Sequence, residues 1–374
     1  MKLKVDRENL YYGLQTVSRA VPQRANIEAL KGVCMETEEN MLHLRGTDLD
    51  MEITCQVPVE KVEEHGSIVL PAKRFLELVK SLSNGAVEII EEESKATIKQ
   101  GKSKIGLNCY AKADFPDSQE TQLSDKQEFE IKFDSLKEAA LQVLPAVAKS
   151  DNRPILTGVC LQSGKDNSIS FIATDAYRLA IKKIQVPSTP EITAVVPARA
   201  LVEVSRLHID PKETIYVQIS DKKACFKTKD VEITVRLLDG SYPNVYGVIP
   251  DKASTRIQAD RAALLSSVER CLVVADIDKS VVQAEIKDSI LSLLATSEVG
   301  SVQEPIDIEK EGEELELAFN PNYLLDCLKA NENNDKLELL FNGPLNPIVV
   351  QRAENPDLLY LLLPVKVAEV KKSA

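Results

Sequence analysis

The chain has 374 residues, more than one hydrophobic core usually supports, so we expect two or three domains. Apolar residues make up 44% and charged residues 28%, which excludes a disordered chain, and no run of 18 uncharged apolar residues is present to span a membrane. The net charge of −12 argues against a generic nucleic-acid-binding protein, which is usually basic.

Seven cysteines are scattered singly, and none is spaced as C-x-x-C. Their odd number and spacing are typical of reduced thiols in a cytosolic protein rather than of a disulfide framework or a zinc site. The first residues, MKLKVDRENL, lack the apolar segment of a signal peptide. We therefore expect a cytoplasmic protein.

The chain begins with an alternating strand that ends at Asp6 and is followed by a helix pattern. The Asp6 carboxylate is placed to cap that helix by accepting a backbone N–H of its first turn. The segments after it predict strands, then a strand, a turn at Pro71 and an amphipathic helix, in this order: LKGVC (30–34), LHLRGTDLDMEI (42–53), SIVLPAKRFLELVKSL (67–82).

The same succession of segments recurs further along the chain. LTGVC (156–160) repeats LKGVC 126 positions later, and VQAEI (282–286) takes the same place a third time. Asp134 and Asp260 stand where Asp6 stands, each before a helix pattern. The strand–turn–helix segment also returns twice, at TAVVPARALVEVSRL (193–207) and LELAFNPNYLLDCLKA (315–330).

These repeats indicate three diverged copies of one unit of about 125 residues. We predict the domains 1–125, 126–253 and 254–374. Each copy has two helices and roughly eight strands, and turn sequences such as SNGA and DKKA favour antiparallel pairing. Few helices combined with mainly antiparallel sheet are typical of the α+β class.

At ATDAYRLA (173–180), PAKRFLELVK (71–80), ADFPD (113–117) and YLLLPVK (360–366), the chain resembles the bacterial DNA polymerase III β subunits, the β sliding clamps. The resemblance extends over essentially the whole length. It implies the DNA-clamp fold and a head-to-tail homodimer, in which two chains of three domains close a six-domain ring around duplex DNA. Helices would line the hole and sheets would form the outer wall.

The function that this resemblance implies is that of a replication processivity factor in the cytoplasm. Such a protein tethers the polymerase by enclosing DNA, without reading its sequence and without a cofactor. The implied partners are double-stranded DNA, a second copy of the chain, the catalytic subunit of the replicative polymerase and a clamp loader. Repair polymerases, mismatch-repair proteins and ligase would bind through short linear peptides.

The charge distribution fits a hole that attracts DNA. The formal charges of the six helical stretches sum to +2. Because the whole chain carries −12, the residues outside these stretches carry −14. Charge balancing within the helices of any acidic protein would give a similar result. Candidates for phosphate contacts lie on or just after the helices: Arg24, Lys73, Arg74, Lys80, Lys149, Arg153, Arg199 and Arg206.

Closing a ring from identical chains requires two different faces of the chain to meet. The resemblance implies that the edge strand KIGLNC supplies Ile105 and Leu107, although both could instead point into their own core. The partner face would hold Leu272 and Val273, with Glu298 and Glu304 opposite Lys73 or Arg74. SEVGSVQE (297–304) is less acidic than the corresponding run of many family members.

The resemblance also implies a hydrophobic peptide-binding pocket between the second and third domains. Its apolar walls would take a Leu and an aromatic anchor of a client peptide, and Arg178 would orient the peptide. Ala176 and Tyr177 replace the Gly and His that are common in the family, and Gly247 replaces an Arg of some members. The implied pocket residues are Leu156, Thr174, Arg178, Leu179, Pro243, Val248, Asn320, Tyr323, Leu362, Leu363, Pro364 and Val365.

No catalytic constellation is visible. GKS (101–103) lacks the preceding Gly of a phosphate-binding loop, and the three histidines are isolated. DLDME (48–52) resembles the start of a calcium loop but lacks its turn Gly. We therefore predict a non-catalytic protein without a metal site. The alternatives are a site assembled from distant residues, such as a metal-dependent nuclease, and a repeat scaffold that binds proteins but not DNA.

Overall fold

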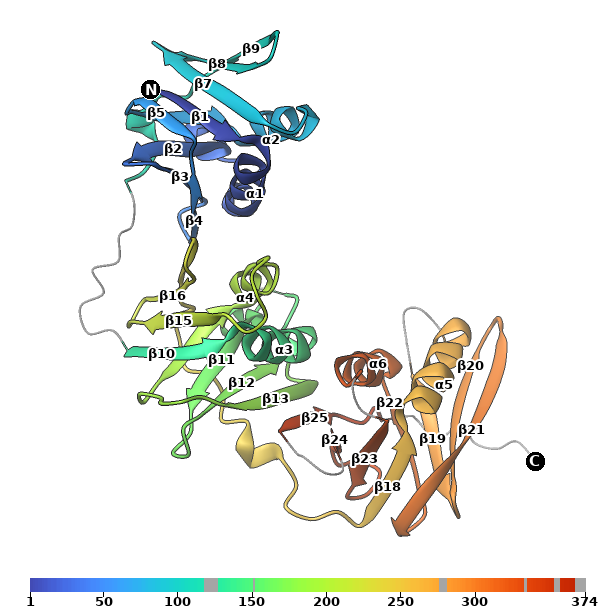
Figure 1. The fold of residues 1–374 in the computed structure, drawn as a ribbon. Helices are drawn as coiled ribbons and strands as arrows, with labels where there is room; N and C mark the ends of the chain where they lie inside the picture. Colours follow the sequence, from blue (N-terminus) through green and yellow to red (C-terminus); the bar gives the residue numbers. More distant parts are fainter. Residues whose placement is uncertain (118–126, 151, 276–280, 333–334, 353–356, 367–374) are drawn as a thin grey trace. The chain divides into compact units, whose positions relative to one another are not determined.

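The protein is described by a computed structural model that covers residues 1–117, 127–150, 152–275, 281–332, 335–352 and 357–366. The chain forms two compact units, one of residues 1–134 and 199–237 and the other of residues 135–198 and 238–374. Helices lie against antiparallel sheets in each unit (Figure 1). The predicted α+β class is confirmed.

The first unit contains two antiparallel sheets. The smaller sheet has the order β5-β1-β7-β8-β9, with β1 (Lys2–Asp6), β5 (Lys61–Glu64), β7 (Ala86–Glu92), β8 (Lys95–Gln100) and β9 (Ser103–Asn108). The larger sheet has the order β10-β15-β16-β17-β4-β3-β2-β6, with β2 (Gly32–Glu38), β3 (Met41–Thr47), β4 (Met51–Pro58), β6 (Ser67–Pro71), β10 (Gln127–Lys132), β15 (Thr214–Ile219), β16 (Lys223–Lys227) and β17 (Val231–Arg236).

The second unit is built on one long antiparallel sheet. Its order is β14-β11-β12-β13-β25-β24-β23-β18-β21-β20-β19-β22. The strands are β11 (Gly158–Ser163), β12 (Ser168–Thr174), β13 (Arg178–Gln185), β14 (Thr193–Pro197), β18 (Thr255–Asp260), β19 (Val282–Lys287), β20 (Ile290–Ser297), β21 (Gly300–Gly312), β22 (Leu315–Phe319), β23 (Lys336–Phe341), β24 (Ile348–Arg352) and β25 (Leu358–Leu362).

The helices begin where the sequence predicts, with one exception. Asp6 caps its helix by accepting the N–H groups of Glu8 (2.8 Å) and Asn9 (3.3 Å), and Asp260 accepts that of Ala263 (2.7 Å). Asp134 instead lies inside the first turn, because its helix already begins at Phe133. The six α-helices of the described residues are α1 (Arg7–Val17), α2 (Ala72–Ser81), α3 (Phe133–Val143), α4 (Ala198–Ser205), α5 (Arg261–Val274) and α6 (Pro321–Ala330).

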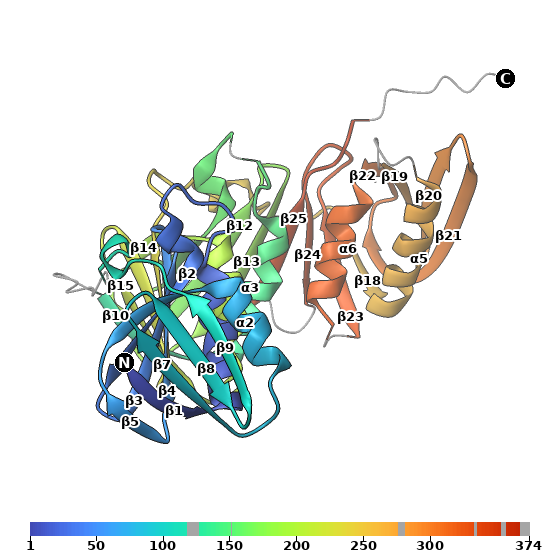
Figure 2. The same ribbon diagram turned by 90° about the horizontal axis from the view of Figure 1, so that it is seen from above.

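Each helix covers a sheet through its apolar positions. Leu10 and Leu14 of α1 are fully buried where α1 packs against β3 and β4. In the second unit, α5 lies along β20 and β21 and beside α6 (Figures 1 and 2). Pro71 and Pro197 end the strands that precede α2 and α4, as the sequence predicts, and Asn320 caps α6.

The structure repeats with the sequence. Of the described strands, nine belong to the first copy and eight to each of the others, with two helices per copy. Strand pairing joins successive copies: β4 pairs with β17, and β13 pairs with β25. Each of these pairs continues a sheet from one copy into the next. Successive copies are therefore joined by backbone hydrogen bonds between strands.

One turn is conserved in detail between the first two copies. Thr47 Oγ1 accepts the N–H of Leu49 (3.0 Å) and donates to the carbonyl of Met51 (3.0 Å), and Asp48 accepts the N–H of Met51 (2.8 Å). Leu49 has φ +81°. The sequence DLDME therefore forms a side-chain-stabilised turn between β3 and β4, and the described residues contain no cluster of His, Cys, Asp and Glu suited to a metal.

Candidate functional site: a peptide-binding surface on β13, β25 and α6

The same turn in the second copy begins the candidate site. Thr174 Oγ1 donates to the carbonyl of Arg178 (2.6 Å) and accepts the N–H of Ala176 (3.1 Å), while Asp175 accepts the N–H groups of Tyr177 (2.9 Å) and Arg178 (3.0 Å). Ala176 has φ +75°, a conformation that favours Gly. The four hydrogen bonds hold Ala176 in this strained conformation and leave Tyr177 64% exposed.

Arg178 is the central polar side chain of the site. It is buried at the start of β13, where its Nε donates to Asp175 (3.0 Å) and its Nη1 donates to Asp326 of α6 (2.6 Å). Its guanidinium lies 4.5 Å from the centre of the Tyr323 ring. The two carboxylates neutralise Arg178 and fix its orientation, so it presents positioned N–H groups rather than a free cation.

Asp175 and Asp326 are absent from the set that the sequence predicts. Asp326 follows Tyr323 by three residues on α6, so the two side chains share one helix face. That spacing is a local signal that places Asp326 beside the predicted residue Tyr323, but its pairing with Arg178, 148 residues away, depends on the joining of β13 to β25. Asp175 lies inside the ATDAYRLA segment, but the sequence alone does not indicate its role in the turn.

Strand pairing brings the apolar residues of β13 and β25 beside Arg178. Leu179 lies opposite Leu361, and Arg178 lies opposite Leu362. Leu363 then donates its N–H to the carbonyl of Tyr177 (2.9 Å), which leaves the Leu363 side chain 36% exposed. An exposed Leu beside a buried and oriented Arg provides both apolar area and directional hydrogen bonding.

Tyr242 is another residue that the sequence did not single out. Its hydroxyl accepts the N–H of Thr174 (3.1 Å) and donates to the carbonyl of Ile172 (3.3 Å), and burial raises its pKa. The neighbouring Pro243 and Val248 are exposed. At Gly247, an added Cβ would meet no atom within 4 Å, so a residue with a side chain could begin here without a clash at its Cβ.

The remaining predicted residues lie in different surroundings. Tyr323 is half-buried. Its burial raises the pKa of its hydroxyl, and the nearby negative charge of Asp175 raises it further. Asn320 caps α6 through the N–H of Asn322 (3.0 Å). Leu156 is buried in a 3₁₀ turn. Half-buried Pro364 and Val365 continue from β25, and Val365 donates its N–H to the carbonyl of Ala318 (2.7 Å).

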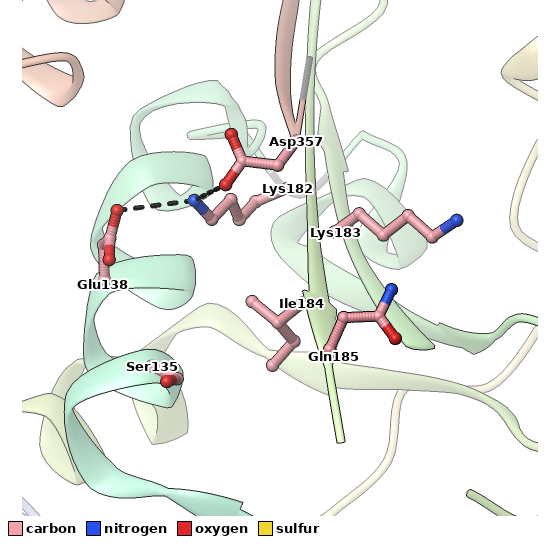
Figure 3. A pocket seen from close by; sticks show the side chains of 7 residues that line it. All are labelled: Ser135, Glu138, Lys182, Lys183, Ile184, Gln185 and Asp357. Carbon is pink, nitrogen blue, oxygen red and sulfur yellow. Dashed lines mark hydrogen bonds and ion pairs between the residues drawn. The ribbon is translucent and has the colours of Figure 1, made fainter. Parts of the chain in front are cut away.

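A separate polar pocket of about 630 Å³ lies further along β13 (Figure 3). Buried Lys182 extends between Asp357 (2.6 Å) and Glu138 of α3 (3.4 Å), and Arg352 also reaches Asp357 (3.2 Å). These ion pairs tie α3 to the sheet where the second and third copies meet. Because the central cation is already paired with two carboxylates, we interpret the cluster as structural.

The candidate DNA-contacting residues fall into two groups. Arg199 forms an ion pair with Asp48 and donates to the carbonyl of Arg19 (3.1 Å), and Arg206 pairs with Glu203 (3.0 Å). Within the part of the chain that the structure describes, the other six are exposed and have no carboxylate partner: Arg24, Lys73, Arg74, Lys80, Lys149 and Arg153. Free cations of this kind are better suited to phosphate contacts.

The candidate interface residues also differ in their surroundings. Ile105 and Leu107 are half-buried on β9, opposite the buried Ile98 and Ala96 of β8, so they lie at the edge of their own core face. Val273 on α5 is 82% exposed. Leu272 is half-buried, and Glu298 is exposed at the turn between β20 and β21.

Glu304 has a partner within its own chain. Its carboxylate accepts from Arg270 Nε (2.7 Å) and from Ser267 (3.3 Å), and the bond from Arg270 holds its pKa below the usual range. Pairing with Lys73 or Arg74, which the family resemblance implies, would require this internal pair to break or to be shared. Glu298 has no such partner among the described residues.

A chain of three α+β copies, joined by continuous sheets and without a metal cluster in its described part, has the architecture of a DNA clamp. Family models of the DNA polymerase III β subunit match it in order: the N-terminal domain at residues 1–119, the central domain at 130–244 and the C-terminal domain at 247–366. The chain belongs to this family, the β sliding clamps, which are non-catalytic processivity factors of DNA polymerase.

Individual relatives agree with this assignment over the full length. The β sliding clamp of Bacillus subtilis (strain 168) is 31% identical, and the alignment covers 98% of this chain and 100% of the relative. The crystal structure of the Pseudomonas aeruginosa β subunit superimposes with a TM-score of 0.93 at 27% identity, covering 98% of this chain and 100% of that one. The B. subtilis clamp structure gives 0.92 at 30% identity, with the same coverage.

The solved relatives include a P. aeruginosa sliding clamp bound to griselimycin.

No helix among the described residues of this protein is long and apolar enough to cross a membrane.

Proposed function

We propose that two copies of this chain pair head to tail and close a ring around duplex DNA, with the domains 1–125, 126–253 and 254–374 as its repeating parts. The observation that carries this proposal is the threefold repeat, matched over its whole length by β sliding clamps. Such a ring holds the polymerase on DNA by topology, so release requires ring opening rather than the breaking of phosphate contacts. This activity places the protein in the bacterial cytoplasm.

Two free strand edges support head-to-tail closure. β9 is the last strand of its sheet, and the first half of β21 pairs with β20 alone among the described strands. An unpaired strand edge readily accepts another strand. The half-buried Ile105 and Leu107 of β9 and the exposed Val273 of α5, which packs against β21, provide apolar area for the same contact.

Charge supports the pairing of these two edges. The turn and strand at β9 carry Lys102 and Lys104, whereas β21 and the turn before it carry Glu298 and Asp307. Opposite charges on the two edges favour contact between unlike edges and disfavour contact between like edges. We assign the ionic role of Glu304 to Glu298, because Glu304 is held by Arg270.

We further propose that the surface formed by Arg178, Leu179, Tyr323, Leu362 and Leu363 binds short peptides of client proteins. Exposed Leu363 and half-buried Tyr323 lie beside a buried and oriented Arg178, over the buried Leu179 and Leu362, a combination suited to an apolar anchor and a peptide carbonyl. Clients of this kind are the polymerase catalytic subunit, the clamp loader, repair polymerases, mismatch-repair proteins and ligase.

Retention on DNA of different topology tests the ring. The chain is loaded onto nicked circular DNA by a clamp loader, and the DNA is then cut once. A ring remains on the circle at high salt and leaves the linear product, whereas a protein held by phosphate contacts leaves both at high salt. Salt-resistant retention on linear DNA, or none on circles despite loader activity on a control clamp, would contradict topological binding.

Fluorescence anisotropy with short peptides carrying Leu and Phe anchors tests the peptide site. Leu363→Asp places a charge on the proposed apolar surface and should reduce affinity at least tenfold. Leu345→Asp is the matched control, because Leu345 is an exposed Leu of the same unit outside the site. Equal effects of the two substitutions would argue against this location.

A further inference from the structure

β21 pairs with different strands along its length. Residues 300–307 pair with β20 on one side, whereas β18 reaches only residues 308–312 on the other. Within the described chain, the first half of β21 therefore has one side without a strand. This side is the edge that the proposed ring would use.

The peptide groups on that side can be identified from the pairing. Ile308 donates its N–H to the carbonyl of Ser289, which precedes β20 (3.0 Å). Because peptide groups alternate sides along a strand, those of Ser301, Gln303, Pro305 and Asp307 point away from β20. Proline has no N–H. The free edge thus has four outward-pointing carbonyls but N–H groups only at Ser301, Gln303 and Asp307.

The free edge of β9 has the complementary spacing. Cys109 donates its N–H to the carbonyl of Ser94, at the β8 side (2.9 Å), so the peptide groups of Lys104, Gly106 and Asn108 point away from β8. Three exposed peptide groups on β9 can therefore face three on β21 in an antiparallel ladder.

The register that pairs all three groups of β9 and also sets the half-buried apolar residues of the two strands opposite each other places Lys104 opposite Pro305, Gly106 opposite Gln303 and Asn108 opposite Ser301. Half-buried Leu107 of β9 then lies opposite half-buried Val302 of β21. At Gly106 an added Cβ would meet no atom within 4 Å, so no side chain of its own copy crowds this part of the edge.

We propose that Pro305 leaves the ring-closing ladder one hydrogen bond short at each interface and thereby sets the strength of ring closure. In the full register, the carbonyl of Lys104 faces the ring nitrogen of Pro305 and finds no donor. Water must solvate this carbonyl, so the two strands separate more easily at this end of the ladder. This inference rests on the ring of the proposed function and concerns how tightly the ring closes.

Substitutions along the β21 edge, followed by sedimentation equilibrium of the full chain, test this role. Pro305→Ala supplies the missing N–H. Since a dimeric ring contains the interface twice, the dissociation constant of the dimer should fall by roughly fivefold to a hundredfold. Gln303→Pro removes a second donor and should raise the constant by a similar factor. Gln303→Ala changes the side chain but keeps the N–H, so the difference between Gln303→Pro and Gln303→Ala measures the lost donor alone.

The outcomes separate this inference from the ring itself. If the wild-type chain dimerises but Pro305→Ala and Gln303→Pro leave the constant unchanged, Pro305 has no such role. If an additional Ile105→Glu variant does dissociate in that case, the proposed ring interface is still supported. If Ile105→Glu also has no effect, or the wild-type chain is a monomer at every concentration, both the ring as drawn and the role of Pro305 are overturned. Thermal melts of each variant identify those that misfold.

Discussion

The guanidinium of Arg178 lies 4.5 Å from the ring centre of Tyr323, and its Nη1 lies 2.6 Å from a carboxylate oxygen of Asp326 on the same helix. β13 and α6 are thus connected through one side chain that is buried and fully oriented before any peptide arrives. Orientation in the free protein reduces the side-chain entropy lost on binding, which is the physical advantage of this arrangement.

Replacing Tyr323 by Leu should weaken peptide binding by roughly tenfold, because the ring forms part of the apolar wall and contacts the Arg178 guanidinium. Anisotropy titration measures this change. Tyr216→Leu is the control, since Tyr216 is an exposed tyrosine on β15. Unchanged affinity in the Tyr323 variant would place the peptide elsewhere.

Ala176→Gly should stabilise the protein by about 1 kcal/mol, because φ +75° is unfavourable for Ala and free of strain for Gly. The free energy of unfolding in urea gives the value. Ala173→Gly makes the same chemical change in regular strand β12 and should destabilise by about as much or more. A destabilised Ala176→Gly variant would show that the turn is not strained.

Alkylation of the cysteines should be slow in the folded chain. Burial raises the pKa of Cys55 and Cys225 to about 12 and that of Cys160 to about 11, so few thiolates exist at pH 8. Mass spectrometry after brief iodoacetamide treatment should find half-buried Cys109 modified before these three. Rapid modification of Cys225 at pH 8 would contradict its burial.

The same raised thiol pKa values predict a loss of stability in alkali. An unfolded cysteine loses its proton near pH 8.5, whereas buried Cys55 keeps its proton until about pH 12. Between these values the folded state binds more protons, so the free energy of unfolding must fall as pH rises above about 8.5. Urea midpoints at pH 7 and pH 10 measure this effect, and a Cys55→Ala, Cys225→Ala double variant should show a smaller decrease.

Lys73→Ala with Arg74→Ala should lower DNA affinity and reduce the salt dependence of log K by about 0.9 for each lost phosphate contact. Both cations are exposed on α2 and have no carboxylate partner in the described structure. Arg199→Ala should change the slope less, because Arg199 is paired with Asp48. Lys165→Ala, in an exposed turn off the helices, is the control. Equal slopes for all variants would exclude α2 from DNA contact.

The sequence by itself determined the three copies, the α+β class and most helix boundaries. These features depend on interactions between near neighbours: Asp6 and Asp260 cap helices through N–H groups two or three residues away, and apolar periodicity determines which face is buried. The boundary at Asp134 was wrong by two residues, because the helix expected after Asp134 already begins at Phe133. The family's residues at the peptide site could be listed from motifs, but their surroundings could not.

Only the tertiary structure decided which charges are free. Arg178 meets Asp326 across 148 residues, Arg199 meets Asp48 across 151, and the carboxylate of Glu304 is taken by Arg270 of its own copy. Pairs of this separation form because β13 adds to β25 and β4 adds to β17 in space, and nothing in the local spacing of residues encodes those neighbours. The missing donor at Pro305 is visible in the sequence, but its direction became known only from the pairing of β21 with β20.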